Sequence, residues 1–381
     1  MPRLAALLSM AALAACQRAP APQPAEALAV SAPLEVLRSG AATQGFELAT
    51  VPRAFEFPAD HGPHSSFRHE WWYVTGNLHA RDGARYGFEL TFFRVGLAPP
   101  GSLAVVAAQS HWHAHELYAA HFAITDVPRH QFQASERFAR AALDLAGARA
   151  DPPRVWLGAW SLGAASMPGE WTLAAADERK ALRLHLRARG PPVANGDHGL
   201  SIKADAPGAA SYYFSIPRIE ASGELSLDGR AVEVTGQAWL DREWGSGGLG
   251  PNETGWDWYA LQFRDGSALM FYALRERSGR RDPHSAGTFV AADGTVRPLA
   301  AADFGVEVLR QWTSPRGGVY PAAWHITVPS LALDVEATPV LADQELDTRP
   351  RYWEGAVDVR GRQRGAAVSG EGYVELVGYA R

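Results

Sequence analysis

Four Asp-Gly pairs divide this chain into short runs of strand-compatible residues. The pairs lie at residues 82–83, 228–229, 265–266 and 293–294. Asp-Gly tolerates the positive φ angles of tight hairpin turns, and such turns join neighbouring antiparallel strands. The spacing of these turns therefore predicts a chain built mainly from antiparallel sheet.

Side-chain alternation within the runs supports the same fold class. In "RYGFELTFFRV" the apolar positions are Tyr86, Phe88, Leu90 and Phe92, and in "ALRLHLRA" they are Leu182, Leu184 and Leu186. Every second residue of a strand faces the same side, so this pattern is typical of strands. One helix is predicted over residues 135–145, where Ser135 can cap an apolar side formed by Phe138, Ala141, Ala142 and Leu145. We expect an all-β protein with minor helix.

Length and composition limit the number of domains and the class of partner. The 381 residues are 47% hydrophobic and include 13 Trp, enough for one large domain or two ordinary ones. The net charge is −5, and Lys180 and Lys203 are the only lysines. Without a basic block, nucleic acid is not an expected partner.

A faint internal repeat favours two domains. "WWYVTGNLHARDGARYGFELTFFR" (71–94) aligns with "DWYALQFRDGSALMFYALR" (257–275) when a short gap is allowed. The repeat predicts two similar β-domains, residues 46–217 and 218–381, with a boundary near Pro217. Chance similarity of two Trp-rich hairpins is the alternative. Closing each sheet into a barrel would remove exposed edges and leave an interior for an apolar ligand.

The N-terminus has the pattern of an export signal. Arg3 precedes an apolar run from Leu4 to Ala15, which is too short to span a bilayer. The run ends in Leu-Ala-Ala-Cys, which resembles the bacterial lipobox, so residues 1–15 are predicted as a signal peptide and Cys16 as the lipidated residue. Residues 16–45, rich in Pro and Ala, then read as a tether. A plain signal peptide with an incidental Cys is the alternative.

The predicted anchor also indicates where the protein works. Gln17 after the lipidated Cys permits sorting to the outer membrane, so we expect an exported protein in the periplasm. Cys16 is the only Cys, which excludes an intramolecular disulfide.

Four histidines in "HWHAHELYAAH" (111–121) raise the question of a metal site. His111, His113 and His115 would share one face of a strand, and neutral imidazoles are common zinc ligands. The alternative is a solvated strand face at a pocket rim.

The densest chemical cluster is "AWLDREWGSGGLGPNETGWDWYALQF", residues 238–263. Its carboxyls are Asp241, Glu243 and Asp257, and its aromatic residues include Trp239, Trp244, Trp256, Trp258 and Tyr259. Glu70-Trp71-Trp72-Tyr73 occupies the corresponding place in the first half. Burial among indoles raises the pKa of a carboxyl, and a carboxyl that stays protonated near pH 7 can act as a general acid. We predict the three carboxyls as catalytic and the aromatic residues, with Glu70, as ligand-binding. The three carboxyls are expected in one aromatic-walled cleft near the junction of the two β-domains, with the hairpin at 70–73 facing this segment across it.

This arrangement suits the addition of water to an alkene. An acid protonates the double bond, aromatic faces stabilise the resulting cation, and a held water adds to it. The same groups suit hydrolysis, with one carboxylate as base. The alternative is an ion-pair network in which Asp241, Arg242 and Glu243 hold the Gly-rich loop.

Several motifs together resemble the AttH-like and carotenoid 1,2-hydratase (hydroxyneurosporene synthase) family, often labelled "predicted secreted hydrolase". They are "HEWWYVTGNL", "LYAAHFAITD", "AWLDREWGSG", "GWDWYALQF", "YPAAWHITVP", "YWEGAVDV" and "GEGYVELVGY", which occur in order across roughly residues 46–381. The resemblance implies two lipocalin-like β-barrels. It matches Trp112 and His121, which we predict as ligand-binding, and implies neither a metal nor a cofactor. His111, His113 and His115 lie outside the family pattern, so we predict a solvated or pocket-rim strand face there rather than a metal site. Members of this branch often sit beside genes for an ABC-type export system.

One position departs from the hydratase pattern. That branch has histidine where this chain has Arg242, and arginine cannot shuttle a proton. Carotenoid hydration itself is therefore not expected. No Gly-x-Ser-x-Gly elbow is present, so a serine-hydrolase mechanism has no support. Two hypotheses remain: a hydratase or hydrolase acting on an apolar, lipid or isoprenoid-like substrate, and a non-catalytic carrier of apolar cargo that works with an ABC-type exporter.

Overall fold

The computed structural model describes residues 43–101 and 115–380, and nearly all of their regular structure is antiparallel strand. The first sheet contains β1 (His69–Ala80), β2 (Arg85–Gly96), β3 (Glu116–Asp126), β4 (Gln131–Arg140), β5 (Ala146–Ala150), β6 (Pro153–Leu157), β7 (Trp160–Ala164), β8 (Glu170–Ala176), β9 (Lys180–Ala188), β10 (Val193–Ala194), β11 (Leu200–Ile202), β12 (Ala210–Leu227) and β13 (Arg230–Gly245). The second contains β14 (Glu253–Phe263), β15 (Ala268–Glu276), β16 (Ala286–Val290), β17 (Val296–Ala300), β18 (Gly305–Thr313), β19 (Val319–Val328), β20 (Leu333–Pro339), β21 (Glu345–Leu346), β22 (Tyr352–Gln363) and β23 (Ala366–Leu376). The short 3-10 helices are η2 (Ala59–His61), η3 (Ala301–Asp303) and η4 (Pro329–Leu331).

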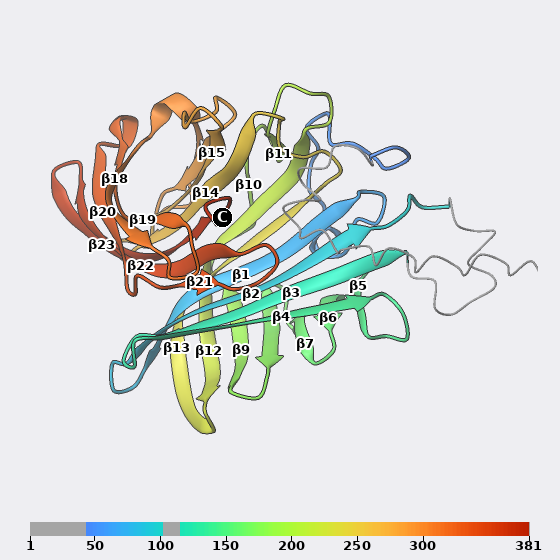
Figure 1. Cartoon of the computed structure of the whole chain (residues 1–381), viewed down its shortest axis with the longest axis horizontal. Helices are drawn as coiled ribbons and strands as arrows, with labels where there is room; N and C mark the ends of the chain where they lie inside the picture. Colours follow the sequence, from blue (N-terminus) through green and yellow to red (C-terminus); the bar gives the residue numbers. More distant parts are fainter. Residues whose placement is uncertain (1–42, 102–114, 381) are drawn as a thin grey trace, which may run out of the picture. The chain divides into compact units, whose positions relative to one another are not determined.

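Each sheet curls into a barrel or half-barrel (Figure 1). The strand order is β4-β3-β2-β1-β13-β12-β9-β8-β7-β6-β5 in the first sheet and β17-β16-β15-β14-β23-β22-β20-β19-β18 in the second. This confirms the all-β fold with two tandem barrels. In the described ranges, no helix has the length and apolar character needed to span a membrane.

All four Asp-Gly pairs lie in hairpin turns, as predicted. They connect β1 to β2, β12 to β13, β14 to β15 and β16 to β17. The glycine of each pair has a φ between +80° and +89°, a conformation that only glycine adopts without strain. The two halves of the sequence repeat are the first and third of these hairpins.

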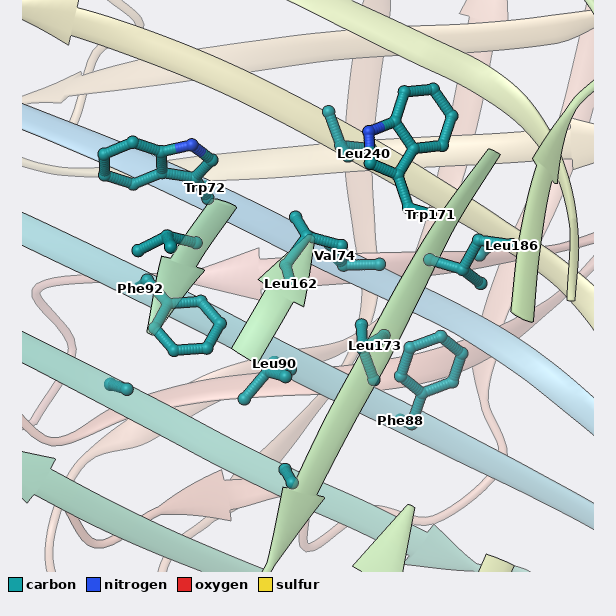
Figure 2. Packing of buried hydrophobic residues seen from close by; sticks show 14 of the residues in the cluster. Trp72, Val74, Phe88, Leu90, Phe92, Leu162, Trp171, Leu173, Leu186 and Leu240 are labelled. Atoms are coloured by element: carbon teal, nitrogen blue, oxygen red, sulfur yellow. The ribbon is translucent and has the colours of Figure 1, made fainter. Parts of the chain in front are cut away.

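Alternate side chains of the strands fill the interior of each sheet. In the first sheet Trp72 and Val74 from β1 meet Phe88, Leu90 and Phe92 from β2 (Figure 2). The predicted apolar face of β9 joins them, since Leu182, Leu184 and Leu186 are buried in the same cluster. A separate cluster around Trp324 and Trp353 fills the second sheet. Burial of this apolar area provides the main favourable term for folding.

The helix predicted over residues 135–145 is wrong. Residues Gln131–Arg140 form β4, which pairs with β3 along its whole length, and turns follow. Phe138 and Leu145, half of the expected apolar side, are exposed. Pairing with β3 satisfies the backbone hydrogen bonds, whereas a helix here would have had no apolar surface to cover.

The predicted boundary at Pro217 is also wrong. Pro217 lies inside β12, at an irregularity in its pairing with β13 between Ile216 and Ile219, and the strand continues beyond it in the same sheet. The change of sheet comes between Gly245 and Glu253. A bulge accommodates proline within a sheet, so the proline marks an irregularity of one strand rather than a domain end.

The outer faces of the two sheets pack on one another. Asn77 of β1 donates a hydrogen bond to the carbonyl of Gly372 in β23, at 3.1 Å. The indole of Trp258 in β14 donates to the Tyr213 hydroxyl of β12, at 3.0 Å, and its ring lies 5.0 Å from that of Tyr73. These strands are therefore buried on both faces, and the polar side chains of their outer faces meet inside the protein.

Candidate active site

A cavity of about 130 Å³ lies between the outer faces of the two sheets. Strands β1, β2, β3, β12 and β13 line one side, and β14, β15, β22 and β23 line the other. Its wall is largely aromatic. An apolar cavity of about 150 Å³ binds a benzene ring, so this one is the size of a single ring or a short branched chain.

Eight of the residues predicted as catalytic or ligand-binding line this cavity. They are Glu70, Trp71, Tyr73, His121, Asp241, Glu243, Trp256 and Trp258. Five of these come from the two hairpins of the repeat, at 70–73 and 256–258, which lie on opposite sides of the cavity. Of the five, Glu70 directs its carboxylate into the first barrel, where it pairs with two arginines. The predicted clustering of Asp241 and Glu243 with indoles at the junction of two barrels is therefore present in the fold.

Five other predicted residues do not line it. Asp257 and Tyr259 point into the second sheet, and Trp72 and Trp244 point into the first, because neighbouring residues of a strand face opposite sides. Trp239 shares the face of Asp241 but serves as its hydrogen-bond donor.

Asp257 does not belong to a common cleft with Asp241 and Glu243, contrary to prediction. Its carboxylate lies 3.0 Å from Arg275 and accepts a hydrogen bond from the Tyr379 hydroxyl. Burial raises the pKa of Asp257 to about 6, although Arg275 opposes that rise. The side chain is part of an ion pair inside the second barrel.

Asp241 is held at the cavity wall by three donors. One carboxyl oxygen accepts hydrogen bonds from Ser215 and from the Trp239 indole, both at 2.6 Å, and the other accepts from the Tyr213 hydroxyl. Burial raises the pKa of Asp241 to about 7; the three donors lower it and nearby Glu243 raises it further. This carboxyl therefore exchanges its proton near neutral pH, as a general acid requires.

Glu243 faces the same cavity but is paired. It accepts a hydrogen bond from Ser211, and the Lys203 ammonium lies 3.2 Å away. Lys203 also donates to Ser201 and lies 4.0 Å from the centre of the Tyr272 ring. Glu243 is thus fixed by charge and hydrogen bonds, and its role differs from that of Asp241.

Glu375 of β23, which was not predicted, faces Asp241 from the opposite sheet. The Trp256 indole donates to it at 3.0 Å. Burial raises the pKa of Glu375 to about 7, and the charges of Asp241 and Glu243 add to the rise. Two carboxyls with matched pKa values therefore belong to opposite walls of one cavity.

A second unpredicted feature is a pair of fully buried glutamates, Glu89 and Glu354. Neither has a hydrogen bond of ordinary geometry to either carboxyl oxygen. Burial raises the pKa of both well above the usual value, and the charge of Glu89 raises that of Glu354 further. Both lie in stretches noted above, "YGFELTFFR" and "YWEGAVDV". In each stretch, the position of the glutamate among the aromatic and apolar residues of a strand was the sequence signal that could have identified it.

The proposed network of Asp241, Arg242 and Glu243 is also absent. Arg242 points into the first barrel, where its guanidinium pairs with Glu70 at 2.5 Å and lies over the Trp72 ring. Glu70 also pairs with Arg94, at 3.1 Å. Glu70 is therefore the centre of a buried ion-pair cluster, and the arginine at position 242 does not remove a proton-shuttling group from the cavity.

His121 links the two sheets. Its Nδ1 atom lies 2.8 Å from the Tyr352 hydroxyl, and its Nε2 atom lies 3.3 Å from Glu136. Trp112, His111 and His113 fall outside the described residues, while His115 is exposed beside β3. In the described part of the chain, no three His, Cys, Asp or Glu side chains are arranged to hold a metal ion, and the prediction about the histidine segment stays a prediction.

We expect the raised pKa of Glu375 to appear in the pH dependence of stability. A carboxyl whose pKa is 4.5 when unfolded and about 7 when folded binds more protons in the folded state, so the free energy of unfolding should fall as pH rises between those values. Glu375→Gln should flatten part of this slope, and Asp241 should account for another part. Urea unfolding at several pH values measures it. Glu276→Gln, at a partly exposed carboxylate that pairs with Arg280 and has a lowered pKa, should keep the wild-type slope in this pH range.

Comparison with known proteins agrees with this architecture. The family profile described as AttH-like matches residues 48–379. The chain belongs to the AttH-like family. A crystal structure of an AttH protein from Nitrosomonas europaea has 35% sequence identity, covers 88% of this chain and 100% of its own, and superposes with a TM-score of 0.78.

More distant relatives carry enzyme names. The crystal structure of kievitone hydratase from Nectria haematococca superposes with a TM-score of 0.66 over 88% of this AttH-like chain and 97% of its own, at 14% identity, which shows a shared fold. The dehydratase asqC of Emericella nidulans is 24% identical over 212 residues, 51% of this chain and 57% of its own length. The AttH-like chain thus spans little more than half of that protein.

Proposed function

We propose that this AttH-like protein is a hydro-lyase that adds water to, or removes it from, an apolar substrate in the cavity between the barrels. The observation that carries the proposal is the pair Asp241 and Glu375, two carboxyls of matched pKa on opposite walls of an aromatic cavity. Addition of water requires one group to give a proton and another to take one, each near its own pKa. The hydratase and dehydratase names of relatives support this reaction class.

The chemistry balances with these two groups. In the direction of hydration, the Asp241 carboxyl gives its proton to one alkene carbon, and a water oxygen bonds to the other. The Glu375 carboxylate takes the proton that this water loses. Dehydration is the reverse, and a proton passing from Glu375 to Asp241 resets the site. The rings of Trp71, Trp256 and Trp258 in the wall favour any positive charge that develops on carbon.

Hydrolysis with the same carboxyls is a second use of this site, and carrying apolar cargo for an ABC-type exporter is the non-catalytic alternative. A carrier has no need for buried carboxyls with raised pKa values, because each costs stability at neutral pH. Asp241 and Glu375 face the cavity without an arginine partner, unlike Asp257. This difference favours the enzyme.

An oxygen-labelling experiment separates these functions. The protein is incubated in H₂¹⁸O with an apolar extract of its own cells, and the products are analysed by mass spectrometry. A hydro-lyase yields a compound that gains labelled water or loses water, whereas a hydrolase yields two fragments, one labelled. A compound that copurifies with the protein and emerges unchanged would instead identify a carrier and overturn the proposal.

We also propose that the protein is exported and anchored by lipid on Cys16, which lies outside the described residues. The support is the Leu-Ala-Ala-Cys end of the N-terminal apolar run. Wild-type protein should partition into detergent with the membrane fraction, and Cys16→Ser should yield soluble or unprocessed protein. Unchanged membrane partition of the variant would contradict the anchor.

A further inference from the structure

Buried polar atoms that lack a hydrogen bond of ordinary geometry gather at one part of the cavity wall. They belong to Tyr73 of β1, Thr91 of β2, His121 of β3 and Glu354 of β22, all of which line the cavity. In the described part of the chain, Glu354 is the one cavity residue whose two carboxyl oxygens both lack a hydrogen bond of ordinary geometry. An unsatisfied buried polar group destabilises the fold, so a cluster of them in one cavity wall indicates a ligand that satisfies them.

The pKa of Glu354 lies well above its usual value, which favours the protonated form of this carboxyl. The groups that face it are Glu89 from β2, Glu375 from β23, Tyr73 from β1 and Tyr352 from its own strand. Burial is the largest cause of its raised pKa, the two glutamates add to it, and the two tyrosines lower it. No lysine or arginine is among these neighbours. A protonated carboxyl is a hydrogen-bond donor, as is a tyrosine hydroxyl.

We propose that Glu354 and Tyr73 together donate hydrogen bonds to a substrate oxygen, so that the substrate is an apolar compound with a carbonyl group conjugated to its reacting carbons. The inference deepens the proposed function and rests on it, because it names the substrate class of the same cavity. A neutral carboxylic acid beside a tyrosine in an apolar site is the donor pair by which ketosteroid isomerase stabilises an enolate oxygen.

The donor pair changes the order of steps in hydration. Water bonds to the β carbon and loses a proton to Glu375, and the electron pair of the double bond moves onto the carbonyl oxygen. That oxygen accepts hydrogen bonds from Glu354 and Tyr73 while it carries the charge. The Asp241 carboxyl then protonates the α carbon and the carbonyl re-forms. Atoms and charge balance, and no other reactant enters.

Glu375 connects the two parts of this site. Its pKa is raised by the charges of Asp241 and Glu243, and its own charge raises that of Glu354. It therefore lies within electrostatic reach of both the proton donor and the oxygen-binding pair. A proton acceptor in this place can take the proton of a water that adds to the β carbon of a carbonyl compound held by Glu354.

Binding of a phenol tests the inference without any turnover. A phenolate oxygen resembles an enolate, and 4-nitrophenol is a single ring whose absorbance distinguishes the neutral from the ionised form. We expect wild-type protein to bind it and to lower the pKa of the bound phenol. Tyr73→Phe and Glu354→Met should each weaken binding at least about tenfold, the effect of losing one hydrogen bond to a charged oxygen. Quenching of tryptophan fluorescence gives the dissociation constant.

Two controls isolate the donor effect. 4-Nitroanisole, which lacks the ionisable hydroxyl, should bind wild type and both variants equally. Tyr373→Phe removes another buried, unpartnered hydroxyl that does not line the cavity, and it should leave 4-nitrophenol binding unchanged. Equal binding of 4-nitrophenol to wild type, Tyr73→Phe and Glu354→Met would overturn the inference.

Stability gives an independent readout. Since neither Glu354 oxygen has a hydrogen bond of ordinary geometry and burial of the carboxyl is itself unfavourable, Glu354→Met should melt no lower than wild type. If that variant fails to fold, Tyr73→Phe alone decides the phenol test. If Tyr73→Phe and Glu354→Met lose 4-nitrophenol binding but the labelling experiment gives no labelled product, the oxygen-binding site is supported and the hydro-lyase proposal is overturned. If labelled product forms but both variants bind 4-nitrophenol as wild type does, the hydro-lyase proposal is supported and the oxygen-binding site is overturned.

Discussion

Asp241→Asn is expected to lower the rate of water addition or removal by about 10²–10⁴-fold, the usual contribution of a general acid. The amide has nearly the shape of the protonated carboxyl but cannot give up a proton at neutral pH. Its oxygen can still accept from Ser215 and Trp239, and its NH₂ group faces the Tyr213 hydroxyl. Stability should therefore change by less than about 1 kcal/mol. The labelling assay measures the rate.

Asp257→Asn is the matched control for that variant. Asp257 is likewise a buried aspartate with a raised pKa, but its side chain faces Arg275 inside the second barrel. The change should spare the reaction and lower the free energy of unfolding, because Arg275 loses its counter-ion. If Asp257→Asn reacted slowly while Asp241→Asn kept the full rate, the active site would not be the cavity described here.

Glu70→Gln is expected to cost about 3–5 kcal/mol of stability, the typical loss when one partner of a buried ion pair is removed. Glu70 is fully buried and pairs with both Arg94 and Arg242, so the neutral amide leaves two buried guanidinium groups with too little negative charge. Urea unfolding followed by tryptophan fluorescence measures the loss.

An exposed ion pair supplies the comparison for Glu70. Glu220 pairs with Arg187 and Arg189 on the surface, and Glu220→Gln should cost no more than about 1 kcal/mol. If Glu70→Gln also cost so little, the Arg94–Glu70–Arg242 cluster would not stabilise the first barrel. Glu70 would then have to be reconsidered as a group that acts in the cavity.

The fold class follows from local sequence because its signals are local. An Asp-Gly pair needs only a few neighbouring residues to form its turn, and the period of two fixes which residues of a strand share a face. For the same reason Asp241 and Glu243 could be placed together from sequence. The helix predicted over 135–145 is wrong because the local apolar pattern there does not reveal that the segment pairs with β3. That pairing is a tertiary interaction, and it decides the conformation of the segment.

The composition of the site was decided by the tertiary structure. Periodicity shows that two residues share a face, but it does not show what that face meets. Asp257 alternates with Trp256 and Trp258, so it had to point away from them, yet only the packed sheets reveal that the cavity lies on the tryptophan side. Glu375 joins Asp241 from another sheet, and Glu354 meets Tyr73 and Glu89 in the same way. The sequence by itself determined an all-β chain of two barrels with carboxyls among indoles. The packing of the two outer faces decided which carboxyls are desolvated, because burial depends on the partner surface and not on the strand that carries the side chain.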